Sequence, residues 1–170
     1  MSIFSVKNDK DGNPVGILHS KLNYVRRAGV TDYDYMYGAG VSVDNAFYEM
    51  MLVKEIYNQY NGKGFYHYVF SPSNDDVYTL SDLYDTGIQI AELIASFEGH
   101  YQVLMTLHYV DERQPHIHLI ANNIDMDTGR RLDLNRQTLV LLKCKINGLI
   151  KRIGLSPIII NSNGCENDGI

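Results

Sequence analysis

The chain has 170 residues, a length typical of one domain, and 45% of them are hydrophobic while 21% are charged, as in an ordinary globular protein. This composition excludes a disordered or low-complexity chain, and the net charge of −5 argues against a protein that binds nucleic acid over its whole surface. The two cysteines have neither the spacing of a zinc ribbon nor that of a disulfide framework.

Apolar spacing predicts four helices and three strands. Leu18, Leu22 and Val25 recur at helical spacing, and Tyr24 lies in the last turn of that helix, away from its apolar face. A β-branched and aromatic run that ends at Pro72 is typical of a strand. In chain order we expect a helix over residues 16–28, a loop over 32–41, a helix over about 44–60, a strand over 65–71, a helix over 79–99, strands over 101–109 and 116–122, and a helix over 135–150.

Polar residues at the predicted helix starts support these boundaries. Asp44 and Asn135 are suited to N-caps, and Thr79 with Asp82 has the pattern of a capping box. The last two strands flank a short polar turn and should therefore pair as a hairpin. Residues 130–134 are expected to extend the sheet.

Strands mixed with segregated helices indicate an α+β fold with a central antiparallel β-sheet and helices packed on it. We assign residues 1–157 to this domain and residues 158–170 to a polar C-terminal tail. The first residues are too polar for a signal peptide, and no apolar run approaches the ~18 residues of a membrane span. We therefore expect a cytoplasmic protein that does not enter a membrane.

The last predicted strand carries two histidines on one face. His116 and His118 alternate with Ile117 and Leu119, so both imidazoles project from one face while the apolar residues enter the core. If the hairpin pairs His108 with His116, a third imidazole joins them. Three histidines leave coordination positions open for water or substrate, as catalytic metal sites do.

The other histidines are interpreted as structural. His19 and His100 have no partner at such spacing, whereas His67 lies on a strand that is able to border the site. A metal on three imidazoles polarises a phosphoryl oxygen and then needs a nucleophile. The chain has 13 tyrosines and no tryptophan, and Tyr24 stands out because basic residues flank it and no carboxylate is near.

Three motifs, in this order, resemble those of conjugative relaxases, the mobilisation nucleases of the HUH endonuclease superfamily. KLNYVRRAG (residues 21–29) is similar to their tyrosine motif, FYHYVFSPS (65–73) to their middle motif, and LHYVDERQPHIHLIANN (107–123) to their histidine motif. The resemblance extends over about residues 21–155, which is nearly the whole chain.

This resemblance implies an enzyme that nicks and rejoins one DNA strand at a specific site, the transfer origin (oriT) of a plasmid or conjugative element. Tyr24 would attack the scissile phosphate and leave a 5′-phosphotyrosine and a free 3′-hydroxyl. His108, His116 and His118 would hold a divalent cation, Mg²⁺ or Mn²⁺, and Ser71 would help to hold the DNA. The implied partners are single-stranded oriT DNA, relaxosome accessory proteins and a coupling protein.

The chain departs from the family pattern after the first histidine of the motif. Relaxases of this kind commonly place an acid two residues after it, where this chain has Val110. Asp111 and Glu112 are therefore both candidates for the carboxylate that orients a metal-bound histidine. Because a basic C-terminal grip and a helicase or primase region are absent, we expect either a minimal relaxase with helper proteins or the catalytic domain of a longer one.

Basic residues gather in two segments although the chain is acidic overall. Residues 129–152 carry seven basic side chains and one acid, and residues 12–31 carry three basic side chains and no acid. Residues 64–112 carry eight acids and neither Lys nor Arg. If the two basic segments meet, they form a face for the backbone of single-stranded DNA. The expected DNA contacts are Lys21, Arg26, Arg27, Ser71, Arg130 and Arg131, with Lys143 and Lys145 as further contacts to the backbone.

Other functions remain open from the sequence. Rolling-circle replication initiators and single-strand transposases of the same superfamily share the chemistry, but they usually place the tyrosine after the histidine pair, whereas Tyr24 precedes it. A non-catalytic module for single-stranded DNA would use the histidines only structurally. A three-histidine metallohydrolase for small molecules would turn over without Tyr24.

Overall fold

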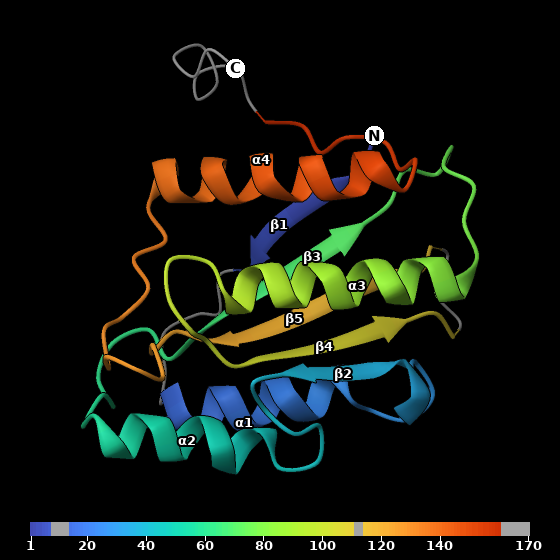
Figure 1. Ribbon diagram of the computed structural model, residues 1–170. Helices are drawn as coiled ribbons and strands as arrows, with labels where there is room; N and C mark the ends of the chain where they lie inside the picture. Colours follow the sequence, from blue (N-terminus) through green and yellow to red (C-terminus); the bar gives the residue numbers. More distant parts are fainter. Residues whose placement is uncertain (8–13, 111–113, 161–170) are drawn as a thin grey trace.

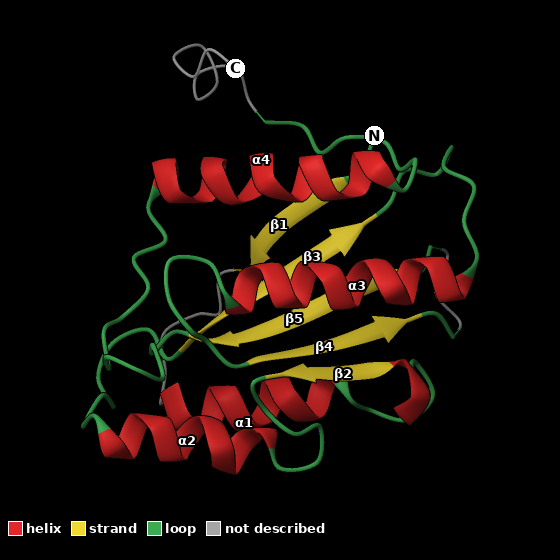
Figure 2. Cartoon of the chain, viewed as in Figure 1, coloured by secondary structure: helices red, strands yellow, loops and turns green. Residues whose placement is uncertain are grey.

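The computed structural model describes residues 1–7, 14–110 and 114–160. In these residues, five antiparallel strands form one sheet, and four α-helices pack on its two faces (Figures 1 and 2). The strands follow the order β1-β3-β5-β4-β2. No helix in these ranges is long and apolar enough to cross a membrane. The elements are β1 (Ile3–Lys7), α1 (Pro14–Val25), the 3₁₀ turn η1 (Tyr33–Tyr35), β2 (Met36–Ala39), α2 (Ala46–Ile56), β3 (Phe65–Ser71), α3 (Leu80–Ala95), β4 (Val103–His108), β5 (His116–Asn122) and α4 (Arg136–Arg152).

Alternation along β5 separates the two faces of the sheet. Ile117 and Leu119 belong to the large core that α3 and α4 cover, whereas Ile120 belongs to a smaller core with α1 and α2. Figure 1 shows α3 in front of the sheet and the pair α1 and α2 beside its β2 edge. Because side chains alternate along a strand, His116 and His118 lie on the Ile120 face, with α1 and α2.

The predicted α+β class is confirmed, and several boundaries agree with the sequence. The strands β3 and β5 have the predicted bounds. At the start of α3, Thr79 Oγ1 accepts a hydrogen bond from the Asp82 amide at 3.1 Å, and the Asp82 carboxylate accepts one from the Thr79 amide at 2.8 Å. Asn135 Oδ1 accepts from the Thr138 amide at 3.0 Å and caps α4. Two of the three predicted caps therefore form.

The two edge strands are missing from the sequence-based prediction. The expected loop over 32–41 is wrong, because this segment contains η1 and β2, which pairs with β4. At the other edge, β1 pairs with β3. Each edge strand is at most five residues long and pairs with a segment at least 60 residues away in the chain. A local pattern contains no information about such a distant partner.

Two further expectations are wrong in detail. The N-cap of α2 is Asn45 rather than Asp44, whose carboxylate instead accepts a hydrogen bond from the Tyr33 hydroxyl at 3.3 Å. Residues 130–134 do not form a strand, since only a single bridge, between Ile124 and Arg131, joins this segment to the residues that follow β5. The chain turns here toward α4 before a second bridge forms.

The end of the described chain returns to its beginning. Ile158 forms a bridge with Ser2 and is 4% exposed within the large core. Asn147 on α4 holds this segment by accepting from the Ile158 amide at 2.7 Å and donating to its carbonyl at 3.1 Å. The division into residues 1–157 and a tail over 158–170 stays a prediction, since residues 161–170 lie outside the described ranges.

A buried lysine fastens α2 to the sheet. Lys54 is 3% exposed, and its ammonium donates to the Gly64 carbonyl at 2.5 Å, to Asn122 Oδ1 at 2.6 Å and to Asn123 Oδ1 at 3.2 Å. These bonds join the helix to the end of β5 and to the segment before β3. Burial of the ammonium lowers the pKa of Lys54 to about 7.

We expect Lys54 to make the stability of the domain depend on pH. Its pKa in the folded protein, about 7, lies below the ordinary value of 10.5, so the unfolded chain binds more protons between these two values. The free energy of unfolding should therefore rise with pH in this window, by up to about 1.4 kcal/mol per pH unit from this group. Urea unfolding at pH 7 to 9 should show a steeper rise for the wild type than for Lys54→Met, and equal slopes would contradict the prediction.

Candidate active site

The three histidines of the predicted metal site come together on one face of the sheet. Pairing of β4 with β5 places His108 opposite His116 and Thr106 opposite His118, which is the register that the sequence predicts. One ring nitrogen from each histidine lies within 4.8 Å of the others. His108 and His118 are buried, and His116 is half-buried at the open side of the group.

Two backbone carbonyls indicate which ring nitrogen of His108 and of His116 carries a proton. His108 Nε2 lies 2.8 Å from the Val25 carbonyl, and His116 Nδ1 lies 3.2 Å from the Gln114 carbonyl. A carbonyl can only accept, so each of these nitrogens carries the proton. In the neutral form of each ring the lone pair is then on His108 Nδ1 and on His116 Nε2, which are the nitrogens that a metal would bind.

The third histidine completes a set of donors that suits a divalent cation. His118 Nε2 lies 3.1 Å from His116 Nε2, so the two rings present nitrogens to the same point. Burial, reinforced by the neighbouring His108, lowers the pKa of His118 to about 2, and its ring is therefore neutral at physiological pH. Three imidazoles fit a metal ion and leave positions open for other ligands. The residues present thus fit the predicted metal site.

His67 extends this group behind His118. Its Nε2 lies 2.8 Å from His118 Nδ1, and the side chain is 4% exposed on β3, next to β5. The carboxylates predicted for this orienting role, Asp111 and Glu112, lie outside the described residues, and their role stays a prediction. The sequence contains one usable signal for His67, because alternation along the strand places it on the face of Ser71. The sequence does not predict, however, that β3 pairs with β5 and so brings His67 to His118.

Tyr24 lies over the histidines from the last turn of α1. The centroid of its ring is 6.0 Å from that of His118 and 6.2 Å from that of His108. The hydrogen bond from His108 to the Val25 carbonyl ties the end of α1 to the sheet beside this tyrosine. The side chain is 46% exposed, as expected for a residue off the apolar face of its helix, and a substrate can reach it.

Cations flank the Tyr24 ring. The Arg27 guanidinium carbon lies 4.1 Å from its centroid and Lys21 Nζ lies 5.8 Å away. Both distances fall within the range of cation–π contact. The site therefore joins a solvent-accessible phenol, two cationic side chains and three imidazoles. This combination suits a negatively charged phosphodiester.

The family model described as "Relaxase: MobA/VirD2-like, nuclease domain" matches residues 21–154. The chain belongs to this relaxase family. It is therefore a DNA transesterase, an enzyme that nicks and rejoins DNA. The match covers the tyrosine, middle and histidine motifs. No curated protein matches its sequence.

Solved structures share the fold of this relaxase domain. A structure described as the molecular basis of vancomycin resistance transfer in Staphylococcus aureus is 12% identical with a TM-score of 0.64, and the match covers 95% of this chain and 99% of that one. The Mn-bound MobM relaxase domain in complex with oriT DNA of plasmid pMV158 and a 3′-thiophosphate is 11% identical with a TM-score of 0.64, covering 99% and 94% of the two chains. A second MobM complex with oriT DNA, also Mn-bound, has a TM-score of 0.61 at 12% identity, covering 99% and 95%.

The other residues expected to contact DNA in the relaxase are divided between two regions. Lys21 and Arg27 lie beside Tyr24 on the histidine side of the sheet. Ser71 is at the end of β3 on the same side, because Val69, two residues before it, is opposite His118. Arg26 lies near them, but its guanidinium donates to the Leu22 carbonyl at 3.0 Å and to the Val43 carbonyl at 2.6 Å. Arg26 thus ties α1 to the segment before α2.

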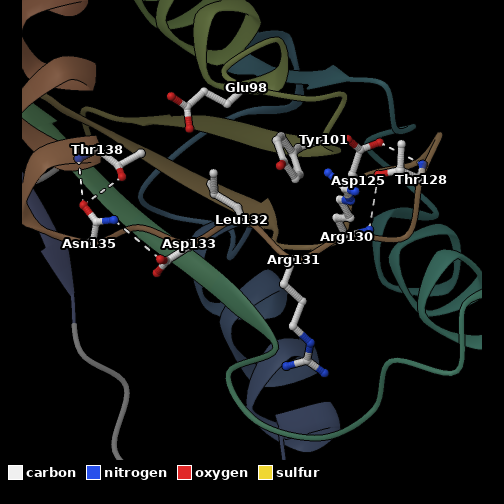
Figure 3. A pocket seen from close by; sticks show the side chains of 10 residues that line it. All are labelled: Glu98, Tyr101, Asp125, Thr128, Arg130, Arg131, Leu132, Asp133, Asn135 and Thr138. Atoms are coloured by element: carbon white, nitrogen blue, oxygen red, sulfur yellow. Dashed lines mark hydrogen bonds between the residues drawn. The ribbon is translucent and has the colours of Figure 1, made fainter.

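The second basic segment lies elsewhere. Arg130 and Arg131 line a cavity of about 510 Å³ between the end of α3 and the start of α4 (Figure 3). Arg131 extends away from the other lining side chains in Figure 3 and donates to Gln59 Oε1 at 2.7 Å. Lys143 and Lys145 are on α4, across the sheet from α1. The continuous basic face considered from the sequence is therefore not formed by α1 and α4.

Proposed function

We propose that this relaxase domain nicks one DNA strand at the transfer origin of a mobile element, with Tyr24 as the nucleophile. The observation that carries the proposal is the position of the exposed Tyr24 ring, 6.0 Å from His118 and 6.2 Å from His108 between ring centroids. A phosphate that enters beside the half-buried His116 would lie next to the Tyr24 hydroxyl. The MobM domain, solved with oriT DNA, supports this substrate class.

We propose that His108 Nδ1, His116 Nε2 and His118 Nε2 hold the divalent cation, Mg²⁺ or Mn²⁺. Such a cation supplies Lewis acidity, which stabilises negative charge on a phosphoryl oxygen. The histidines contribute nitrogen donors whose other ring nitrogens contact the Val25 carbonyl, the Gln114 carbonyl and His67. The Mn-bound MobM structures support this choice of metal.

The proposed reaction conserves the energy of the phosphodiester. Tyr24 Oη forms a bond to phosphorus while the bond from phosphorus to the 3′ oxygen breaks, and the hydroxyl proton is lost to solvent or to the leaving oxygen. The products are a 5′-phosphotyrosine and a free 3′-hydroxyl, which reverses the reaction when it attacks the adduct. The Arg27 guanidinium, 4.1 Å from the ring centroid, stabilises negative charge that develops on the phenol oxygen.

Single-stranded oriT DNA is the proposed substrate, and we propose Lys21 and Arg27 as its contacts beside the nucleophile. Neutralising both with Lys21→Gln and Arg27→Gln should lower the log-log salt slope of DNA binding by about 0.7 for each lost contact. The matched pair Lys143→Gln and Lys145→Gln on α4 tests the further contacts predicted from the sequence. Since α4 is across the sheet from α1, we expect this second pair to leave the slope unchanged.

The proposal is tested with single strands that tile the transfer origin of the element encoding the protein. Incubation with Mn²⁺ should produce a cleaved strand and a covalent adduct on a denaturing gel, and mass spectrometry should place the nucleotide on Tyr24. Binding without an adduct would indicate a non-catalytic module and contradict the proposal. Relaxosome accessory proteins and a coupling protein stay predictions, to be tested by reconstitution of the nicking complex on supercoiled oriT plasmid.

A further inference from the structure

We propose that His67 is a positioning residue of the metal site, which holds His118 with its Nε2 toward the cation. The inference rests on the proposed function, because it requires that His118 be a metal ligand. It concerns a residue outside the three ligands and outside the carboxylates predicted from the sequence.

The geometry behind this inference is a contact between two buried imidazoles. His67 Nε2 lies 2.8 Å from His118 Nδ1, the ring centroids are 5.1 Å apart, and the planes are inclined by 36°. The side chains are 4% and 5% exposed. The strands that carry them are neighbours, with Val69 opposite His118 and His67 opposite Ile120. The two rings therefore meet diagonally across one strand pair on the buried face.

The chemistry of imidazole assigns the direction of this hydrogen bond in the loaded site. When His118 Nε2 binds a metal with its lone pair, the ring proton resides on Nδ1, and Nδ1–H must find an acceptor. His67 Nε2 is at hydrogen-bond distance from that nitrogen. His67 then accepts this proton through its own lone pair, and His118 cannot rotate away from the metal without breaking the bond.

A neutral acceptor differs from the carboxylate that commonly fills this position. A carboxylate adds negative charge beside the ligand and makes the ligand more basic, whereas an imidazole orients the ring and adds no charge. The cation on three histidines therefore keeps more of its positive charge for the phosphate. His67 accordingly gives orientation without neutralising the Lewis acid.

The first test measures Mn²⁺ binding by calorimetry without DNA. His67→Phe keeps a ring but removes the acceptor, and its affinity for Mn²⁺ should fall by about 10- to 100-fold. His67→Gln, whose carbonyl oxygen can accept from His118, should restore most of the affinity. His100→Phe is the matched control, because His100 is 65% exposed and contacts Asp127 away from the site, and it should bind like the wild type. Melting temperatures of the metal-free proteins show that each variant is folded.

The second test uses the wild-type protein and does not depend on the folding of a variant. In ¹⁵N-labelled protein loaded with Mg²⁺, a scalar coupling across the hydrogen bond should connect His118 Nδ1–H with His67 Nε2. A coupling from His118 Nδ1–H to another acceptor would overturn the inference, as would wild-type Mn²⁺ affinity in folded His67→Phe. Absence of Mn²⁺ binding in the wild type would instead refute the proposed metal centre and, with it, the role of His67.

Discussion

Tyr24→Phe should abolish the covalent adduct between protein and DNA and lower strand cleavage by about 10³-fold or more. The substitution removes only the hydroxyl that attacks phosphorus, and loss of a nucleophile commonly costs several orders of magnitude in rate. The ring should keep its place between Arg27 and His118, because its contacts there are made by the ring and not by the hydroxyl. Binding of single-stranded DNA should therefore change little, and gel analysis of adducts with parallel anisotropy measurements checks both expectations.

Tyr48→Phe provides the matched control for this experiment. Tyr48 is on α2 and is 73% exposed, so the same hydroxyl is removed from a tyrosine that is at least as accessible to DNA. We expect full adduct formation in this variant. An adduct that persists in Tyr24→Phe would show that another residue is the nucleophile and would contradict the proposed mechanism.

His116→Ala should weaken Mn²⁺ binding by about 100-fold or more and eliminate nicking at micromolar metal. A change in a residue that only orients a ligand costs about 10- to 100-fold in affinity, so the loss of a ligand should cost at least as much. His116 is the best position for this test, since it is half-buried at the start of β5, whereas His108 and His118 are buried. Its replacement therefore disturbs the core least. Calorimetry with Mn²⁺ and cleavage assays over a range of metal concentrations measure the two effects.

DNA binding in the presence of a chelator distinguishes loss of metal from loss of structure. His116→Ala should bind single-stranded DNA as the wild type does under these conditions, and its melting temperature without metal should be similar. His100→Ala, at an exposed histidine, should keep full metal affinity. Wild-type Mn²⁺ affinity in His116→Ala would exclude this residue as a ligand.

Residue alternation was sufficient to predict the centre of the site. In a hairpin whose strands flank Pro115, two histidines separated by one residue must share a face, and only one register brings His108 opposite His116. The structure has that register. The core positions of Ile117 and Leu119 follow from the same alternation. The place of Tyr24 came from the resemblance of the motifs, because nothing in local spacing relates the end of a helix to a strand more than 80 residues later.

Features that depend on distant pairing could not be predicted in this way. The contact between His67 and His118 requires that β3 and β5 be neighbours, and β1 and β2 become strands only through their partners. Charge patterning was also insufficient. It grouped Lys143 and Lys145 with Lys21, yet the apolar face of α4 packs on the opposite side of the sheet from α1.

One imidazole connects the helix of the proposed nucleophile to the proposed metal ligands. His108 Nε2 donates to the carbonyl of Val25, the residue that follows Tyr24, which leaves His108 Nδ1 for the proposed cation. The position of the end of α1 relative to the three histidines is thus set by a single rigid ring. A displacement of the end of α1 when a DNA strand enters would move a proposed metal ligand at the same time, and DNA binding would then be coupled to the geometry of the metal site.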